Sequence, residues 1–436
     1  MSSQTSARSP SSATLYRSGM FQSLAIRDFR FLWMGSVCAS FAMQMQIVAR
    51  GWLIYDMTSS PMALTWVMLS FMLPSFLFSL GGGVIADRSR KKAIMIISQS
   101  LNAIATVLLA WIVVTDQVTF WHFIYFGLFN GTVLAISMPA RSSVTPEIVG
   151  DENLVNAMAL QSATFNLARI LGPVLAGIVI AIFAAGDTTS TFGVGVVFFV
   201  IAALYAISVL ATALLRYQGK PQRLVESTPM EDIREGFRYM RDEKIVLGLL
   251  IMGLVPMTFG FSASFLLPAF NQDIIGGGPD DLGYLMMGMG VGALGGSLML
   301  ARAGDFGRKG RVMFLASFAW AFAMFGFAFS GSLMTAMVMG ALVGLFSSVF
   351  GSLNMTVVQL AVRAEIRGRV MSIMMMTHGL MPLGTLPVSA LAEYVGIEVA
   401  LMFAAVMLLL SMLLLGFWIP ELQRIDKGHG SHVSNV

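Results

Sequence analysis

Charged residues are scarce in this chain. They make up 11% of its 436 residues, against about 25% in ordinary soluble domains. Hydrophobic residues make up 56%, and no soluble fold of this size needs that much apolar surface. This composition excludes a soluble enzyme or binding domain and indicates a polytopic membrane protein. Cysteine is almost absent: Cys38 is the single one, so an intramolecular disulfide framework is excluded.

The first 20 residues lack the features of a cleaved secretory signal. They are rich in Ser and Arg, with neither the apolar core nor the small-residue cleavage site of a signal peptide. We expect them to be a disordered tail, followed by a short amphipathic helix over residues 21–30 on the membrane surface. The first membrane span would then serve as an uncleaved insertion signal.

Long apolar runs recur along the rest of the chain. About 20 apolar residues are needed to cross the hydrocarbon layer as a helix. The sequence therefore predicts an all-α membrane protein with twelve transmembrane helices. The spans are expected at 31–54, 62–85, 93–115, 119–140, 157–184, 191–215, 245–270, 282–301, 312–330, 333–360, 370–393 and 399–419.

The basic residues give the orientation. With both termini cytoplasmic, 25 of the 27 Lys and Arg fall in the tails and the cytoplasmic loops, and the other two, Arg50 and Arg169, fall within spans. The outer loops carry acidic residues instead. Because cytoplasmic loops attract Lys and Arg, we predict a multi-pass protein of the bacterial inner (plasma) membrane. This also accounts for the pI of about 9.3 without a nucleic-acid partner.

Acidic residues are missing from the middle of every predicted span. Asp56 and Glu393, at the predicted outer ends, are the nearest candidates for a proton carrier, although surface anchoring explains them as well. Paired catalytic carboxylates and metal-ligand clusters are also missing, which argues against an intramembrane enzyme. The 34 methionines suggest copper, but methionine is also an adaptable filler of apolar cores. We therefore expect no metal and no cofactor.

One acidic and basic loop occurs twice. The residues around Asp87 recur 218 residues later around Asp305, and Lys91 maps onto Lys309. A repeat of half the chain length, flanked by apolar segments, predicts two related six-helix bundles. Secondary transporters are typically built in this way.

A polar break separates the two halves. Residues 216–244 contain two prolines and an amphipathic segment, which we expect to lie against the inner face as a linker. The predicted organisation is a tail and surface helix (1–30), an N-terminal bundle (31–215), the linker (216–244), a C-terminal bundle (245–419) and a cytoplasmic tail (420–436). Nothing in this pattern requires oligomers, so a monomer is expected.

The repeated loop resembles the signature loop of the major facilitator superfamily, Gly-x-Leu-Ala-Asp-Arg-x-Gly-Arg-Lys. The resemblance implies a gating motif in which the aspartate meets the N-terminal end of a helix from the other bundle, where free N–H groups favour a carboxylate. An alternative for the basic residues is a purely topological role. The predicted gating residues are Gly83, Asp87, Arg88, Lys91, Lys92, Asp305, Arg308 and Lys309.

Further segments resemble one branch of the superfamily, which contains the enterobactin exporter and macrolide efflux proteins (transmembrane secretion effectors). They are residues 29–33, 49–58, 139–147, 166–173 and 367–372. Gly172, Pro173 and Gly177 also resemble the exporter motif of helix 5, although an ordinary proline-kinked helix is the simpler alternative. Taken together, the helix 5 motif and the resemblance to this branch imply that the protein exports its substrate.

Polar residues at membrane depth are candidate substrate contacts, because such groups are costly in a bilayer. Asn166 and Arg169 share a helix face with Pro173. For Arg169 the alternative is a structural hydrogen bond between helices, and for Arg50 it is snorkelling to the surface. The predicted cavity residues are Gln46, Arg50, Asn130, Asn166, Arg169, Thr258 and Asn354.

The resemblance thus implies a secondary transporter that exports an amphipathic small molecule by alternating access. Protons are the expected coupling ion, and a siderophore-like or other acidic or neutral metabolite is the expected substrate. A macrolide-type multidrug efflux pump is the alternative. A non-transporting membrane receptor or anchor is a rival from another class, but no segment is long enough to be a signalling domain.

Overall fold

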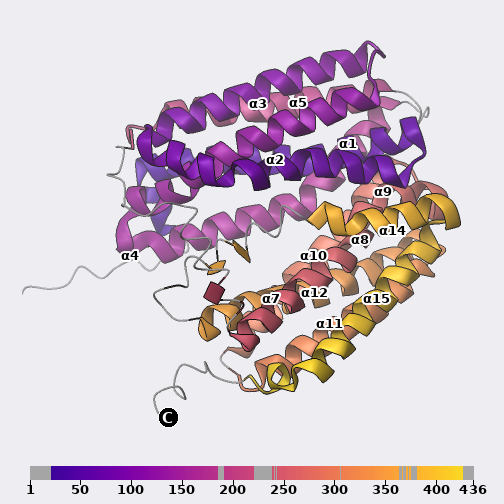
Figure 1. The fold of residues 1–436 in the computed structure, drawn as a ribbon. Coiled ribbons are helices and arrows are strands. Elements are labelled where there is room, and N and C mark those ends of the chain that lie inside the picture. The colour runs from indigo at the N-terminus through magenta and orange to yellow at the C-terminus, as the bar shows by residue number, and fades with distance from the viewer. Residues whose placement is uncertain are drawn as a thin grey trace, which may run out of the picture.

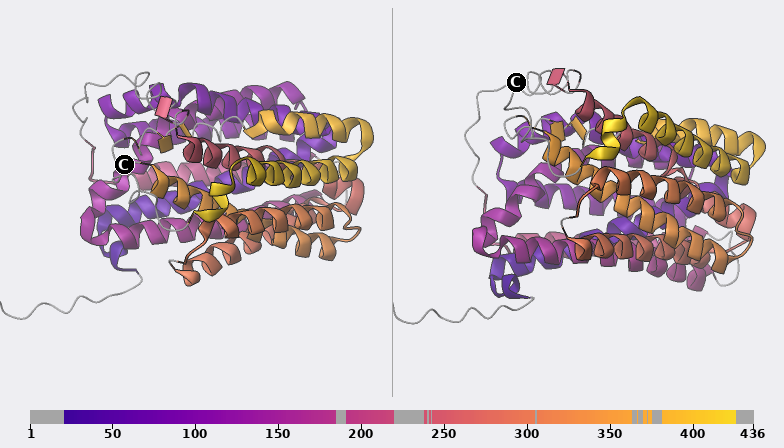
Figure 2. Two further views of the ribbon diagram at one scale, coloured as in Figure 1. Left: turned by 60° about the horizontal axis from the view of Figure 1, so that its bottom comes forward. Right: turned by 90° about the horizontal axis from the view of Figure 1, so that it is seen from below.

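The computed structural model describes residues 21–184, 191–219, 238–239, 241, 243–304, 306–362, 366, 370–371, 373–374 and 381–425. At residues 79–84, 86, 87, 257 and 424 it describes the backbone alone. The described residues form helices joined by short loops, arranged as two bundles (Figures 1 and 2).

The N-terminal bundle begins with a 3₁₀ turn, η1 (Gln22–Ala25). It continues with α1 (Arg27–Thr58), α2 (Pro61–Arg88), α3 (Lys91–Val114), α4 (Phe120–Ala184) and α5 (Thr191–Ala213). The predicted surface helix over 21–30 is therefore only a short turn, and Arg27 already begins α1. The first turn of α1 carries Arg27, Asp28 and Arg30, so hydropathy alone places the start of the span later.

The C-terminal bundle contains α7 (Lys244–Phe259), α8 (Ser262–Phe265), α9 (Leu267–Phe270) and a π-helical turn, η2 (Asn271–Ile275). These are followed by α10 (Pro279–Ala303), α11 (Lys309–Ala328), α12 (Leu333–Ala361), α14 (Met381–Val395), α15 (Ile397–Trp418) and η3 (Pro420–Arg424). The predicted span 245–270 is thus broken after Phe259. Pro256 and Pro268 each remove a backbone donor from this stretch, which accounts for its irregularity.

In the part of the chain described, nine helices are long and apolar enough to span a membrane. One of them, α4, covers the two predicted spans 119–140 and 157–184, and it is kinked between them at Gly150. Gly150 has φ 65° and ψ 173°, a conformation that glycine adopts without strain. The remaining predicted spans fall on shorter helices, including α7 and α14. The all-α, many-helix membrane fold is therefore confirmed.

The internal repeat is visible in where the helices begin. Helices α2 and α10 begin at Pro61 and Pro279, and α3 and α11 begin at Lys91 and Lys309. Each pair of starts is separated by the same 218 residues that separate the repeated loops. Proline at the first position of α2 and α10 suits a helix start, because its missing N–H would have no partner there.

The two bundles pack along α4 against α10 and along α2 against α14, with α1 touching α9 and α10. The ribbons lie side by side near α9 and α14 and diverge toward the opposite end of the molecule (Figure 1). We name the two ends by their loops. The Ser59 end carries the α1–α2 loop, and the Ser89 end carries the α2–α3 loop.

Glycine allows the bundles to approach closely. A Cβ atom at Gly177 of α4 would lie 2.3 Å from the carbonyl oxygen of Pro279, and one at Gly283 of α10 would lie 2.8 Å from that of Pro173. Neither backbone could move aside without separating the helices. The small-residue pattern of these spans therefore serves close helix packing, here across the two bundles.

Candidate functional site

Hydrogen bonds between described residues of the two bundles lie at the Ser59 end. The Tyr55 hydroxyl donates to Oδ2 of Asp273 at 2.5 Å. Thr65 and Ser389 share a hydrogen bond of 2.6 Å between their hydroxyls. These contacts tie α1 to η2 and α2 to α14, so the two bundles are joined at this end.

Glu393 adds an ionic contact to the same end. Its Oε2 accepts hydrogen bonds from Oγ of Ser60 at 2.8 Å and from the backbone N–H of Met62 at 3.2 Å. Ser60 is the N-cap of α2. A carboxylate at a helix N-terminus is stabilised by the unpaired N–H groups and by the helix dipole. Glu393 is thus a cross-bundle cap, rather than only the surface anchor considered from the sequence.

The exporter motif lies in this closed region. A Cβ atom at Gly172 would lie 2.7 Å from the Cβ of Gln44 in α1, whereas Pro173 and Gly177 face α10 as described above. The motif therefore makes contacts on both sides, to α1 inside its own bundle and to α10 across the interface. An isolated kink would not require either contact.

Arg50 is buried next to the Ser59 end, with 5% of its surface exposed. Its Nη2 lies 3.3 Å from Sδ of Met68, and its guanidinium lies 5.4 Å from the ring centre of Phe71. Salt bridges between described residues are Arg27–Asp28 and Lys91–Glu147, so no described carboxylate pairs with Arg50. Burial rules out the snorkelling alternative for this residue.

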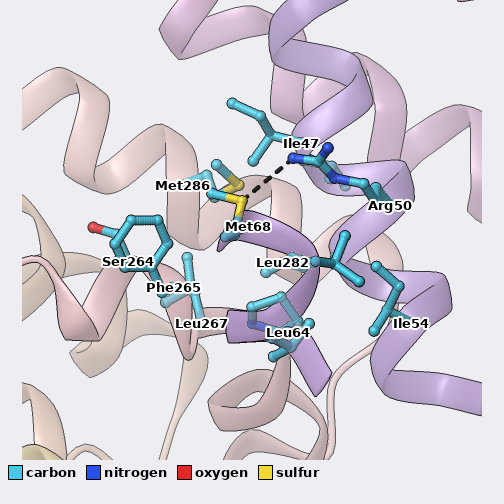
Figure 3. Close-up of a pocket in the computed structure, with 14 residues that line it drawn as sticks. Ile47, Arg50, Ile54, Leu64, Met68, Ser264, Phe265, Leu267, Leu282 and Met286 are labelled. Atoms are coloured by element: carbon cyan, nitrogen blue, oxygen red, sulfur yellow. Dashed lines mark hydrogen bonds between the residues drawn. The ribbon is translucent and has the colours of Figure 1, made fainter. Parts of the chain in front are cut away.

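A small pocket adjoins Arg50 at the interface of the bundles (Figure 3). Side chains of α1 and α2 face those of α8, α9 and α10 across it. Its other labelled walls are apolar or weakly polar, so Arg50 supplies its charge. The labelled residues are Ile47, Arg50, Ile54, Leu64, Met68, Ser264, Phe265, Leu267, Leu282 and Met286.

Two predicted cavity amides carry buried donors without acceptors in the described part of the chain. Gln46 and Asn130 are each 5% exposed, and Nε2 of Gln46 and Nδ2 of Asn130 make no hydrogen bond. Most buried polar groups are paired. These two are therefore candidates for contact with water or a bound molecule.

The other predicted cavity residues are more dispersed. Asn166 donates to the Ser162 carbonyl one turn back, and Arg169 is partly exposed on α4. In the other bundle, Thr258 donates to the Leu254 carbonyl and Asn354 to the Leu249 carbonyl at 3.1 Å. The structure thus brings Arg50 to one pocket and Asn354 to the lining of another, and it gives Thr258 and Asn354 hydrogen bonds within their own bundle.

At the Ser89 end, the polar contacts of Lys91 and Lys92 stay within the N-terminal bundle. Lys91 is 2% exposed and forms a salt bridge with Glu147, which also accepts a hydrogen bond from Tyr217. Lys92 donates to the carbonyls of Ala213 (2.9 Å) and Leu215 (2.5 Å), at the C-terminus of α5. A cation there satisfies unpaired carbonyls and complements the helix dipole.

Lys91 and Lys92 therefore have structural roles that the sequence did not reveal, because the partners are distant along the chain. Burial raises the pKa of Glu147, but the hydrogen bonds from Lys91 and Tyr217 and the charge of Lys91 outweigh it, so the pKa lies below its ordinary value. Burial raises the pKa of Tyr217, and the hydrogen bond that its hydroxyl donates to Glu147 raises it further.

The predicted gating residues are only partly visible. Arg88 and Arg308 are exposed, and Lys309 is buried and donates to the Phe306 carbonyl at 2.8 Å. Asp305 lies outside the described residues. For Gly83 and Asp87 the structure describes the backbone alone. The gating role of the aspartates stays a prediction.

Comparison with known proteins agrees with this architecture. The family model of the transmembrane secretion effectors matches residues 18–435. The chain is 25% identical to the staphyloferrin A transporter of Staphylococcus aureus, over 80% of this chain and 86% of that protein. It is 27% identical to the multidrug efflux pump Tap of Mycolicibacterium fortuitum, over 87% and 92%.

The chain is also 25% identical to the enterobactin exporter EntS of Shigella boydii, over 66% of this chain and 67% of that protein. Among solved structures, a mutant of the nucleoside transporter NupG superposes with a TM-score of 0.72 at 15% identity, covering 91% of this chain and all of that one. These proteins are transporters, not enzymes. The chain belongs to the transmembrane secretion effector family of major facilitator transporters.

Proposed function

We propose that this protein exports an amphipathic, acidic or neutral small molecule across the bacterial inner membrane by alternating access, with protons as the driving ion. The observation that carries the proposal is the set of cross-bundle contacts at the Ser59 end. Tyr55–Asp273, Thr65–Ser389 and the Glu393 cap close that end.

The orientation follows from charge. The loops of the Ser89 end carry the basic residues, including Arg88, Lys91 and Lys92, and such loops are cytoplasmic in membrane proteins. With this orientation the structure is closed to the outside, which is the state in which an exporter receives its cargo. The termini are then cytoplasmic too.

The charge of the interface supports the substrate class. Arg50 is a buried cation without a described carboxylate partner, and no acidic residue lies mid-span. A charge in a region of low dielectric acts strongly on whatever it faces. A lipophilic cation would be repelled there, whereas a carboxylate or catecholate would be attracted. The named relatives, which include the staphyloferrin A transporter and EntS, are consistent with an acidic cargo.

An efflux panel tests this substrate class. In a strain without its major pumps, we expect export of acidic and neutral aromatic metabolites and little export of ethidium-like cations. Arg50→Ala and Arg169→Ala should reduce export of the acidic compounds more than that of the neutral ones, and Arg169→Lys should restore it only in part, because a point charge does not reproduce a planar fork. Strong cation export that is indifferent to both arginines would overturn the proposed substrate class.

Cysteine labelling tests the orientation separately. In a Cys38→Ala background, cysteines at Ser89, Ser227 and Ala303 should react from the cytoplasmic side, and those at Ser59, Thr188 and Gly277 from the outside. One exchanged pair would break the twelve-span orientation. This assay needs no substrate, so it stands even if the substrate class is wrong.

The gating proposal has its own test. Asp87→Asn should leave the protein inserted but reduce transport severalfold, because a cap at a helix end contributes about 0.3–2 kcal/mol, and that is enough to shift a two-state gate. Asp305→Asn should do less, because Ala301 replaces the first glycine of its loop. Wild-type efflux by Asp87→Asn at matched expression would refute the gating role.

Macrolide-type efflux is the second candidate. The chain is 22% identical to macrolide efflux protein A of Streptococcus pyogenes over 85% of its length. The scarcity of charge at the interface would suit a largely apolar drug. Raised macrolide resistance in the same panel, unaffected by the arginine variants, would favour this candidate over the first.

A further inference from the structure

The first half of α4 exposes opposite faces at its two ends. Near the Ser59 end, Trp121 and Tyr125 are 61% and 64% exposed, as suits aromatic side chains at a membrane boundary. Nearer the Ser89 end, Met138 is 56% exposed and Arg141 is partly exposed. At 3.6 residues per turn, Arg141 is rotated by about 160° from Tyr125. Arg141 is therefore exposed on the side of α4 that faces away from the lipid, where the protein opens into a recess.

The same face of α4 is polar deeper in the bundle. Asn130, Ser137 and Arg141 follow one another at spacings of seven and four residues, which places them on one side of the helix. Asn130 and Ser137 are each 5% exposed, so this side of α4 points into the protein. Arg141 is the member of the row that is open to solvent, and it stands at the end of the row nearest the Ser89 end.

Arg141 lies inside the helix and not in an inner loop, where the sequence places it. Helix α4 folds back at Gly150, because Nε2 of Gln161 donates to Oγ1 of Thr145 at 2.6 Å, whereas residues 16 apart in a straight helix are separated by about 24 Å. Arg141 precedes this turn by nine residues, or about 13 Å along the axis. It is therefore about 9 Å deeper than Glu147, whose salt bridge with Lys91 marks the Ser89 end.

The guanidinium of Arg141 has no partner among the described residues. It makes no hydrogen bond or salt bridge with them, and its nitrogens remain accessible. Glu147, the nearest acidic residue on α4, is already bound by Lys91 and Tyr217. Tyr205 of α5 interacts electrostatically with both Arg141 and Arg50, so the two cations belong to one region of the N-terminal bundle. A guanidinium carries five N–H donors in a planar fork that fits a carboxylate.

We propose that Arg141 binds the carboxylate or catecholate group of the cargo in this recess, as its first charged contact on the cytoplasmic side. The inference rests on the proposed export of an acidic molecule, and it adds the residue that selects such a molecule at entry. Arg50 is buried near the Ser59 end, so the anionic group meets it only after the bundles have moved. Arg141 is accessible in the present state.

A cysteine at Met138 reports the charge of the recess without any substrate. Met138 is three residues from Arg141, so the two side chains are neighbours on the helix. In inside-out vesicles carrying Cys38→Ala and Met138→Cys, the rates of reaction with the anionic thiol reagent MTSES and the cationic reagent MTSET are compared at low ionic strength. A neighbouring cation attracts the first and repels the second. We expect the MTSES-to-MTSET rate ratio to fall about tenfold when Arg141→Gln is added.

The same cysteine measures binding of an anion. Salicylate should slow the labelling of Met138→Cys, and its neutral amide, salicylamide, should need at least a fivefold higher concentration for the same effect. Arg141→Gln should abolish this difference. Arg141→Lys should keep the rate ratio but bind salicylate more weakly, because a point charge does not reproduce the fork. Arg302→Gln is the matched control, since Arg302 is an exposed arginine in the last turn of α10, and it should leave both measurements unchanged.

A rate ratio that is the same with and without Arg141 would overturn the placement of its charge in an accessible recess. Equal protection by salicylate and salicylamide in the protein that retains Arg141 would overturn the anion site. Salicylate protection that depends on Arg141, in a protein that exports none of the acidic panel, would support the site and refute the transport proposal. Export of the acidic compounds that is equally strong in Arg141→Gln would overturn the role of Arg141 and leave the proposed function standing.

Discussion

The two ends of the molecule use polar residues in opposite ways. At the Ser59 end, hydrogen bonds such as Tyr55–Asp273 and Thr65–Ser389 join one bundle to the other. At the Ser89 end, the contacts of Lys91 with Glu147 and of Lys92 with the end of α5 hold the N-terminal bundle together. One end is built as a contact between two bodies, and the other strengthens a single body.

This difference fits a transporter that rocks. Contacts that must break and re-form in every cycle should be individually modest, and those at the Ser59 end are one buried hydroxyl pair, Thr65–Ser389, and hydrogen bonds to the carboxylates of Asp273 and Glu393. Contacts that persist can be stronger, and Lys91, which is 2% exposed, forms a salt bridge with Glu147. The comparison predicts that changes at the Ser59 end alter transport, whereas changes to the Lys91–Glu147 pair at the Ser89 end alter stability.

The largest effect should come from preventing the Ser59 end from opening. Thr65→Cys with Ser389→Cys, in a Cys38→Ala background, places two thiols where the hydroxyl oxygens are 2.6 Å apart. Oxidation should abolish transport, and a reductant should restore it. Efflux or vesicle uptake, followed by gel analysis of the cross-link after proteolysis, measures both events.

The chain supplies a matched control for this cross-link. Ser297 of α10 and Ser348 of α12 are 2.7 Å apart at their hydroxyls and lie within one bundle. The corresponding double-cysteine variant should oxidise without loss of transport. Inhibition by this control, or full transport with the Thr65–Ser389 pair cross-linked, would contradict the idea that the Ser59 end is a moving contact.

A smaller but still large effect is expected from Gly177→Val. The new Cβ would lie 2.3 Å from the Pro279 carbonyl oxygen, so α4 and α10 could no longer meet. Transport should fall about tenfold or more, and a cysteine at Gly277 should label faster, because the closed state is disfavoured. Gly295→Val is the control, because it adds the same side chain at a position where a Cβ atom meets nothing within 4 Å. It should behave as the unchanged protein in both assays.

The sequence was sufficient for the membrane class, the repeat and the family, because these depend on hydropathy, period and motif. The broken α7–α9 region was missed, because hydropathy does not register where Pro256 and Pro268 interrupt hydrogen bonding. The division of α4 at Gly150, where the backbone is not helical, agrees with the two separate spans predicted at 119–140 and 157–184.

The candidate site was harder to predict, for a physical reason. Arg50 could be singled out, because an ionisable residue in a span is costly. The roles of Glu393 and Lys91 depend on partners far away in sequence, and no local pattern marks them.

A severalfold effect is expected from weakening the carboxylate cap of α2. Glu393→Gln removes the charge that faces the backbone N–H of Met62 but keeps the size of the side chain. A cysteine at Ser59 should then label faster from outside, because the closed state loses part of the cap of α2. Glu398→Gln, in the first turn of α15, is the control at the same end. An unchanged labelling rate in Glu393→Gln would show that the cap does not contribute to closure.

The smallest effect on transport, and a clear effect on stability, is expected at the Ser89 end. The pKa of Glu147 lies below its ordinary value, so the folded state favours the ionised form. The stability this contributes is present above the ordinary carboxyl pKa and is lost as the pH falls through the lowered one. Glu147→Gln should therefore lower the melting temperature at pH 7 by about 1–2 °C, and the difference from the unchanged protein should shrink as the pH falls through the lowered pKa of Glu147. Because the pair lies within one bundle, efflux per folded molecule at pH 7 should stay within about twofold of the unchanged protein. A large loss of efflux without a change in melting temperature would mean that Glu147 belongs to the moving contact, and the contrast between the two ends would fail.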